Sequence, residues 1–154
     1  MTVYVLALLI GIVAGLRTMT APAAVSWAIY WGWLDVSGTW LSFLGNIWAR
    51  VILTIFALGE LIVDQLPSTP SRTVPVQFGG RIVTGALSGA AVGAGSGALV
   101  GGLIAGVIGA IIGTLGGRRF RGWLAASFKN DHPAALIEDL VAIGGALLIA
   151  VALR

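Results

Sequence analysis

Three features of the sequence predict an all-α integral membrane protein. Hydrophobic residues make up 58% of the 154 residues and charged residues only 10%, whereas a soluble domain carries about 25% charged residues. The mean hydropathy is +1.00. Several stretches lack charge altogether, the longest being 82–117. This composition excludes a soluble domain and a disordered chain, and the 23 glycines lack the three-residue period of collagen.

Missing residue types exclude several kinds of site. The chain has no cysteine, which removes disulfides, iron–sulfur clusters, thiolate zinc sites and cysteine nucleophiles. His132 is the single histidine, so a metal site with several histidine ligands is excluded. We therefore expect no metal and no cofactor. The formal charge of +3 indicates membrane topology rather than a nucleic-acid surface, because it rests on so few charged residues.

Two short apolar stretches open the chain, at 2–16 and 21–34, with the polar segment 17–22 between them. Pro22 disfavours helix at the residue before it, so we expect a break before Pro22 and a new helix starting there. A span needs about 20 residues, so two shortened spans and one hairpin with a polar apex inside the membrane both fit. The start of the chain lacks the basic segment of a signal peptide and is interpreted as a retained span.

An aromatic region comes next. Five of the six tryptophans fall within 27–48, and amphipathic rings collect at the headgroup level, so this region is expected at one membrane face. The stretch 49–66 is the next predicted span, and it carries Glu60 and Asp64. The three prolines of 67–75 indicate a rigid, non-helical loop.

The uncharged stretch 82–117 must fold back on itself. As one helix it would measure about 54 Å, against a hydrocarbon core of about 30 Å, and the glycine-rich segment 93–97 is the expected bend. Glycine recurs at every fourth position from 85 to 117, with Ala105 filling the one gap. Small side chains let helix backbones approach closely. We therefore predict that this glycine ladder is a helix–helix contact surface.

The last third of the chain is predicted to form a basic loop at 116–123, a short interfacial helix at 124–129 and a final span at 134–153. Asp131 is the expected N-cap of the final helix, with Pro133 in its first turn. The chain then has about six short transmembrane helices in a single domain.

A weak internal repeat divides this domain, 1–154, into halves at 1–78 and 79–154. The four residues that end at Glu60 resemble the four that end at Glu138, which lie 78 positions later. Because each half would contain three spans, the halves would have opposite orientations, which is the inverted-repeat plan of many transporters.

The basic residues predict the orientation. Seven of the nine lie in loops that share one face if there are six spans, which favours that face as cytoplasmic and both termini as external. We expect a multi-pass membrane protein with membrane lipids as partners. A homodimer is expected, since small chains with six helices leave little surface and most oligomers are symmetric dimers. The seven residues are Arg17, Arg72, Arg81, Arg118, Arg119, Arg121 and Lys129.

A set of motifs extends over nearly the whole chain. In order they are G-L-R-T-x-T-A-P-A (15–23), G-E-x-x-x-D-x-L-P (59–67), P-S-R-T-x-P (70–75), R-x-x-x-G-A-x-x-G-A (81–90) and I-E-D (137–139). Together they resemble a bacterial membrane-protein family, the domain of unknown function four-one-two-six. The resemblance implies a small multi-span inner-membrane protein and implies no activity.

Four carboxylates are candidate site residues. Glu60 and Asp64 lie four positions apart and share one face of a helix, and Glu138 and Asp139 lie at the edge of another span. Ionisable groups at membrane depth face a cavity or a charged partner. In one interpretation they bind a cation or carry protons, foremost Glu60 and Glu138. In the other they pair with Arg17, Arg72 or Arg81 and hold helix ends together.

Two Arg-Thr pairs are candidate anion sites. Arg17 and Thr18, with Thr20 nearby, lie where a helix is expected to break, and freed backbone N–H groups at such a break can bind an anion. Arg72 and Thr73 repeat the pair in the proline-rich loop, and both loops could close over one ligand. The alternatives are an ordinary cytoplasmic turn and contacts to lipid phosphates.

These residues leave three functional hypotheses. The first is a small transporter or channel for a small anionic or cationic solute. The second is a structural or accessory membrane protein that packs with partner subunits through its glycine ladder. The third is a lipid-processing enzyme that uses Glu60 or Glu138, but the chain has no Ser-x-x-x-Lys, Gly-x-Ser-x-Gly or His-Glu-x-x-His motif, so we expect no enzyme.

Overall fold

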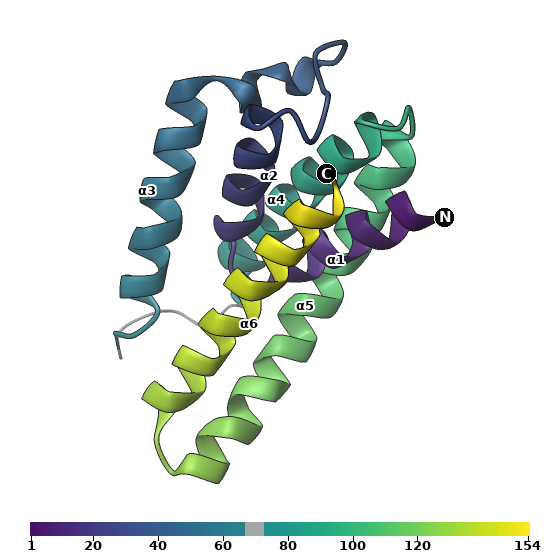
Figure 1. Cartoon of the computed structure of the whole chain (residues 1–154). Helices are drawn as coiled ribbons and strands as arrows, with labels where there is room; N and C mark the ends of the chain where they lie inside the picture. The colour runs from purple at the N-terminus through teal and green to yellow at the C-terminus, as the bar shows by residue number, and fades with distance from the viewer. Residues whose placement is uncertain (67–72) are drawn as a thin grey trace.

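The computed structural model describes residues 1–66 and 73–154, and every regular element within them is helical. This confirms the all-α prediction for the described residues. The predicted breaks near Pro22 and at 93–97 are also confirmed. Arg72 and most of the predicted loop 67–75 lie outside the described residues. The elements are α1 (Thr2–Leu16), α2 (Thr20–Tyr30), the 3-10 helix η1 (Trp40–Gly45), α3 (Ile47–Val63), α4 (Pro75–Ala94), α5 (Leu99–Phe128) and α6 (Asp131–Ala152) (Figure 1).

Two of the helices in the described part of the chain, α5 and α6, are long and apolar enough to cross a membrane. Helix α1 is apolar but has only 15 residues. Helices α2 and α3 have 11 and 17 residues, and a straight span needs about 20. Helix α4 has 20 residues but is not apolar enough. Length and apolarity together therefore weakly support membrane association through two helices of the described residues, and they do not support the expected six transmembrane helices.

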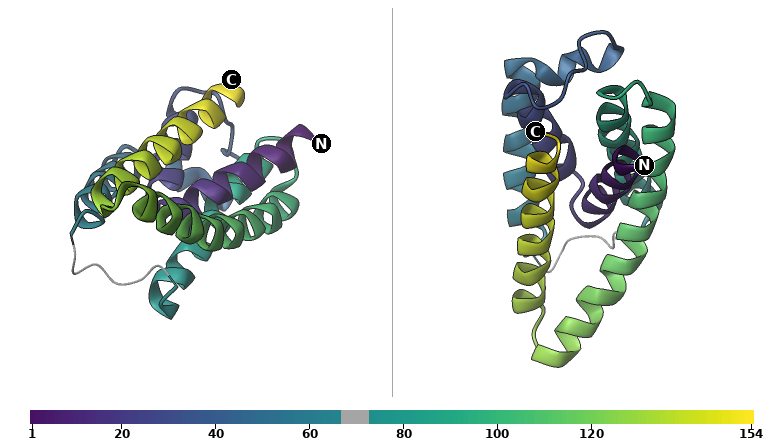
Figure 2. Two further views of the ribbon diagram at one scale, coloured as in Figure 1. Left: turned by 90° about the horizontal axis from the view of Figure 1, so that it is seen from below. Right: turned by 45° about the vertical axis from the view of Figure 1, so that its right-hand side comes forward.

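Helix α5 is the centre of the packing, and α1 and α4 lie along it (Figures 1 and 2). Glycines bring α4 and α5 together without intervening side chains. A Cβ added at Gly89 would lie 2.7 Å from the Cα of Gly106, and one at Gly85 would lie 2.8 Å from the carbonyl oxygen of Gly106. Real Cβ atoms do not approach backbone so closely, so these positions require glycine at this helix spacing.

A second glycine contact joins α1 to α5. A Cβ added at Gly109 would lie 2.9 Å from the backbone nitrogen of Ile12, and one at Gly11 would lie 2.9 Å from the Cα of Gly106. The predicted glycine ladder is thus confirmed as a contact surface, but it is not one surface. Its members on α4, such as Gly89, face α5, whereas its members on α5, such as Gly109, face α1. The glycines of α5 that face α4 are Gly102 and Gly106, which do not belong to the ladder.

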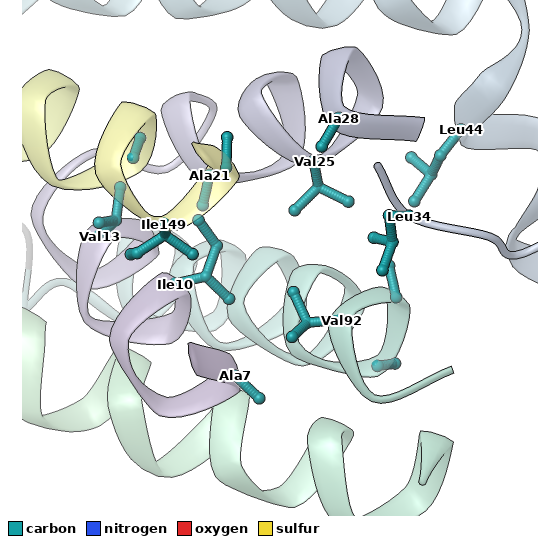
Figure 3. Close-up of a cluster of buried hydrophobic side chains, with 14 of the residues drawn as sticks. Ala7, Ile10, Val13, Ala21, Val25, Ala28, Leu34, Leu44, Val92 and Ile149 are labelled. Carbon is teal, nitrogen blue, oxygen red and sulfur yellow. The ribbon is translucent and has the colours of Figure 1, made fainter. Parts of the chain in front are cut away.

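Small aliphatic side chains fill the space between α1, α2, α4 and α6. The cluster includes Ile10 of α1, Val25 of α2, Val92 of α4 and Ile149 of α6, all buried, with several alanines between them (Figure 3). Many large apolar side chains instead face outward, including most of α3. An outer surface of this kind suits a lipid environment.

Helix α3 lies at the edge of the bundle, and Arg50 is its one buried residue. Its guanidinium lies 3.7 Å from the ring centroid of Tyr30 and 5.1 Å from that of Trp27, both in α2. Thr54 of α3 accepts a hydrogen bond from the indole N–H of Trp27 at 3.1 Å. Polar and cation–π contacts to α2, rather than a buried apolar face, therefore hold this part of α3 in place.

The predicted basic loop at 116–123 and the separate helix at 124–129 are wrong. Helix α5 continues through both and ends at Phe128, where Lys129 adopts a left-handed φ of 54°. Buried Leu124 and the ion pairs of Arg121 hold the extension against the rest of the fold. The α5–α6 hairpin therefore projects beyond the other helices (Figures 1 and 2).

The cap of α6 also differs from the prediction. The side chain of Asn130, rather than Asp131, accepts the hydrogen bond of the His132 N–H at 3.2 Å, and Asp131 is the first helical residue. The expected span 134–153 matches α6 except that the helix begins three residues earlier and ends at Ala152.

The inverted repeat gains no support from the helices. Glu60 lies in the last turn of α3, whereas Glu138 lies near the start of α6. Residues related by an inverted repeat occupy the same position in their helices and opposite membrane faces. The ion pairs described below place Glu60 and Glu138 in one cluster, and the division into halves at 1–78 and 79–154 stays a prediction.

Candidate functional site

Buried and partly buried charges from α3, α4, α5 and α6 and from the α1–α2 break meet in one cluster. At its centre is Arg17, whose side chain is fully buried. Arg17 follows the last residue of α1 in an extended conformation, with φ −137° and ψ 114°, and its N–H still donates to the carbonyl of Val13 at 2.7 Å. The end of α1 therefore directs this residue into the interior rather than toward solvent.

Three carboxylates surround the Arg17 guanidinium. It forms ion pairs with Asp64, which follows α3, and with Asp139 of α6, where its Nε donates to Oδ1 at 2.6 Å. Glu138 Oε2 lies 3.9 Å from Nη2. An arginine offers several donors in a fixed plane and can bind carboxylates on more than one side. Arg17 therefore ties the ends of α1, α3 and α6 together.

Glu60 makes a different kind of contact. Its two carboxylate oxygens accept hydrogen bonds from the backbone N–H groups of Thr18 at 2.7 Å and Met19 at 2.8 Å. These N–H groups lie just before α2, where a helix start leaves donors without helical partners and carries partial positive charge. Glu60 is thus a carboxylate that occupies the anion-binding end of a helix.

Arg81 of α4 completes this side of the cluster. It is almost fully buried, its Nη1 donates to the carbonyl oxygen of Gly15 at 2.7 Å, and its Nη2 lies 4.0 Å from Glu60 Oε1. Thr114 Oγ1 of α5 lies 3.4 Å from the same carbonyl, but its hydroxyl donates to the Ala110 carbonyl at 2.7 Å. The Gly15 carbonyl near the end of α1 therefore receives a side-chain donor, while the N–H groups just before α2 receive a carboxylate.

The remaining predicted residues lie outside this centre. Thr20 is buried in the first turn of α2, and Thr18 contributes its backbone rather than its hydroxyl. Thr73 accepts a hydrogen bond from Arg118 Nη1 at 3.4 Å, away from Arg17. Arg72 lies outside the described residues, so the predicted pairing of two Arg-Thr loops stays a prediction.

Two participants were not among the predicted site residues. Arg121 of α5 pairs with Asp131 at 2.7 Å and lies 3.6 Å from Glu138. Gln65 donates to Asp139 Oδ2 at 3.2 Å. The sequence predicts Arg121 only as one of the seven basic residues of the cytoplasmic face, and its helical spacing from Leu124, which is buried, is the one signal that could separate it.

The cluster lies close to one end of the uncharged part of α5. A Cβ added at Gly15, two residues before Arg17, would lie 2.5 Å from the backbone nitrogen of Thr114, and the first charged residue of α5 is Arg118. Helix α3 ends at Val63 rather than Leu66, so Glu60 is one turn from its end. The cluster is thus a charged layer near one end of an otherwise apolar bundle, and not at its middle.

The arrangement favours negative over positive ligands at the α1–α2 break. Glu60 faces two N–H donors and Arg81, and Asp64 faces Arg17. If the Glu60 carboxylate left, the groups exposed would be hydrogen-bond donors and positive charge. A cation would find its carboxylate ligands already engaged with arginine.

Comparison of the chain with protein families, curated proteins and solved structures found no match. The site must therefore be interpreted from its own geometry.

Proposed function

We propose that this protein is a small membrane transporter for a small anion, and that the anion binds at the α1–α2 break. The observation that carries the proposal is the seating of the Glu60 carboxylate on the N–H groups of Thr18 and Met19. In discontinuous membrane helices such half-helix ends are where anionic substrate groups bind. Glu60 takes the place of the substrate in the conformation described above.

Protonation of Glu60 is the step that would admit the substrate. A neutral carboxyl group loses its charge-assisted hydrogen bonds, so an anion can replace it on the two N–H groups. Arg81 Nη2 of α4 lies 4.0 Å from Glu60 Oε1, and Asp64, four positions after Glu60, pairs with Arg17. Anion binding and proton uptake are therefore coupled in this proposal.

Glu60→Gln is expected to abolish proton movement driven by an anion gradient while leaving the fold intact. The amide of glutamine is nearly isosteric with the carboxylate but cannot take up and release a proton as a carboxylate does. Wild-type and variant protein would be placed in vesicles containing a pH-sensitive dye, with chloride, nitrate, acetate and phosphate tested in turn. We expect the variant to match empty vesicles, a fall of about tenfold or more.

Arg154→Gln is the control, because it also replaces a charged side chain with an amide and Arg154 is exposed after the end of α6. It is expected to retain wild-type flux. Undiminished proton movement in Glu60→Gln would remove Glu60 from the site, and no movement in the wild type with any of the four anions would contradict the transport proposal.

A structural or accessory role is the second candidate, and the saturation of Arg17 by Asp64 and Asp139 favours it. On this alternative, Glu60 only caps the break. Glu60→Gln would then lower thermal stability and change no flux, so the same variant separates the two.

The arrangement in the membrane belongs to the same proposal. We propose that α1, α2, α3 and α4 are also embedded, as six short helices in the bacterial inner membrane. The outward-facing apolar side chains of α3 and the shared end of the two termini in Figure 1 support this. Association as a homodimer stays a prediction.

A further inference from the structure

A pocket of about 530 Å³ lies at the end of α2 opposite the Arg17 cluster. It is formed by the last turn of α2, the turn that follows and η1. Its walls are apolar at Ile29, Leu34 and Val36 and polar at Asp35, Ser37 and Ser42. None of the residues of the proposed transport site lines this pocket.

Asp35 supplies negative charge to this pocket. Its Oδ1 accepts hydrogen bonds from the Ser37 hydroxyl at 2.7 Å and from the Ser37 N–H at 2.9 Å. These bonds, the hydroxyl first, lower the pKa of Asp35 below its usual value, so the carboxylate stays ionised at neutral pH. Both bonds use the same oxygen, and Oδ2 makes no hydrogen bond with any described residue.

The end of α2 adds to the negative potential. Ile29 and Gly32 line the pocket, and the carbonyl end of a helix carries partial negative charge. The last turn of α2 itself contains no basic residue, and Arg50 of α3 packs on the rings of Trp27 and Tyr30. The hydroxyl oxygens of Ser37 and Ser42 are further acceptors.

These features suit an organic cation rather than a metal ion. Calcium takes six to eight oxygen ligands, and one carboxylate with two hydroxyls falls short of that number. An ammonium group on a carbon chain would use both the acceptors and the apolar walls. Trp31 and Trp33 precede and follow the pocket residue Gly32 in the sequence, and their ring centroids lie 4.8 Å apart. The rings of Trp27 and Tyr30 are instead covered by the guanidinium of Arg50.

We infer that the pocket bounded by Asp35, Ser37 and Ser42 binds a primary ammonium group carried on an apolar body. A primary ammonium has three donors, which match Asp35 Oδ2 and the two hydroxyls. The ammonium could belong to the ethanolamine headgroup of a phospholipid or to a free alkylamine. The tryptophans nearby place the pocket at headgroup level, where either can reach it.

Native mass spectrometry and tryptophan fluorescence test this inference on the full-length protein. The probes are phosphatidylethanolamine, phosphatidylcholine and free n-butylammonium. We expect the wild type to prefer phosphatidylethanolamine or n-butylammonium over phosphatidylcholine by about tenfold, because a quaternary ammonium cannot donate a hydrogen bond. Asp35→Asn should remove that preference, and Asp131→Asn, an exposed acid at the far end of the molecule, should keep it.

The two probes distinguish the source of the ammonium. Preference for the lipid alone assigns a headgroup, and binding of n-butylammonium alone assigns a free amine. Equal retention of ethanolamine and choline lipids, or undiminished binding in Asp35→Asn, would overturn the inference. Because Asp35 is exposed, its substitution should leave the fold unchanged, and the thermal transition of the variant checks this.

Discussion

Replacing Gly106 with alanine is expected to prevent the bundle from assembling. Gly106 is the position where α5 meets both α4 and α1. A Cβ added at Gly106 would lie 3.0 Å from the Cα of Gly89 in α4, and a Cβ added at Gly11 in α1 would lie 2.9 Å from the Cα of Gly106. The atoms nearest to this Cβ are backbone atoms of Gly85 and Gly89, which cannot rotate away as a side chain can. Overpacking of a core costs about 1–3 kcal/mol and occasionally more, a large part of the stability of a small domain.

Gly116→Ala is the matched control in the same helix, because nothing lies within 4 Å of a Cβ added there. Alanine favours helix over glycine by about 1 kcal/mol, so this variant should be as stable as the wild type or slightly more so. Thermal unfolding and size-exclusion chromatography in detergent measure both. A monodisperse Gly106→Ala variant with an unchanged transition would show that the helices are not packed backbone to backbone.

Removal of the Arg17 side chain is expected to have the second large effect. Arg17→Met keeps much of the volume but leaves Asp64 and Asp139 facing each other without their cation. Breaking a buried ion pair by removing one partner costs about 3–5 kcal/mol. We expect the variant to express poorly or to unfold at a much lower temperature than the wild type.

Neutralising the two acids tests the electrostatic cause. The triple variant Arg17→Met, Asp64→Asn, Asp139→Asn removes the uncompensated charges and should recover part of the lost stability, since a neutral cluster carries a smaller desolvation penalty. Recovery measured by thermal unfolding supports the account. A triple variant no more stable than Arg17→Met alone would mean that Arg17 acts through packing.

Local backbone chemistry made several parts of the fold predictable from sequence. Pro22 and the glycine-rich bend at 93–97 are positions where a helix cannot continue easily, and the structure places breaks beside both. The glycines at every fourth position predicted a contact surface because small side chains let helix backbones approach closely. Which helix each glycine faces was not predictable, because the rotation of α5 depends on α1 and α4 together.

The predicted loop at 116–123 failed for a different reason. Paired glycines followed by several arginines are typical of a cytoplasmic turn, and the contacts that keep this segment helical come from α6 and from the end of α3. Such long-range partners leave no signal in the local sequence. The contact between Arg17 and Asp139 is another example, because the two residues lie 122 positions apart.

The candidate site was predictable as a set of residue types but not as a geometry. The sequence offered two partners for the carboxylates, arginines or a bound ion, and it suggested that the break after α1 could hold an anion. In the structure these two features meet, because Glu60 of α3 accepts hydrogen bonds from the N–H groups of the break. This contact depends on how α3 packs against α2. That packing rests on Arg50 and Trp27 and could not be inferred from Glu60 itself.

The most direct test of the account is the amide NMR signal of Thr18 and Met19 in lipid nanodiscs. We predict that both amides report a strong hydrogen bond in the wild type, lose it in Glu60→Gln, and then shift again when chloride, nitrate, acetate or phosphate is added. That result would place an exchangeable anion site at the α1–α2 break. Signals that respond to Glu60→Gln but to none of the four anions would show that Glu60 is a helix cap only, and the transport proposal would be wrong.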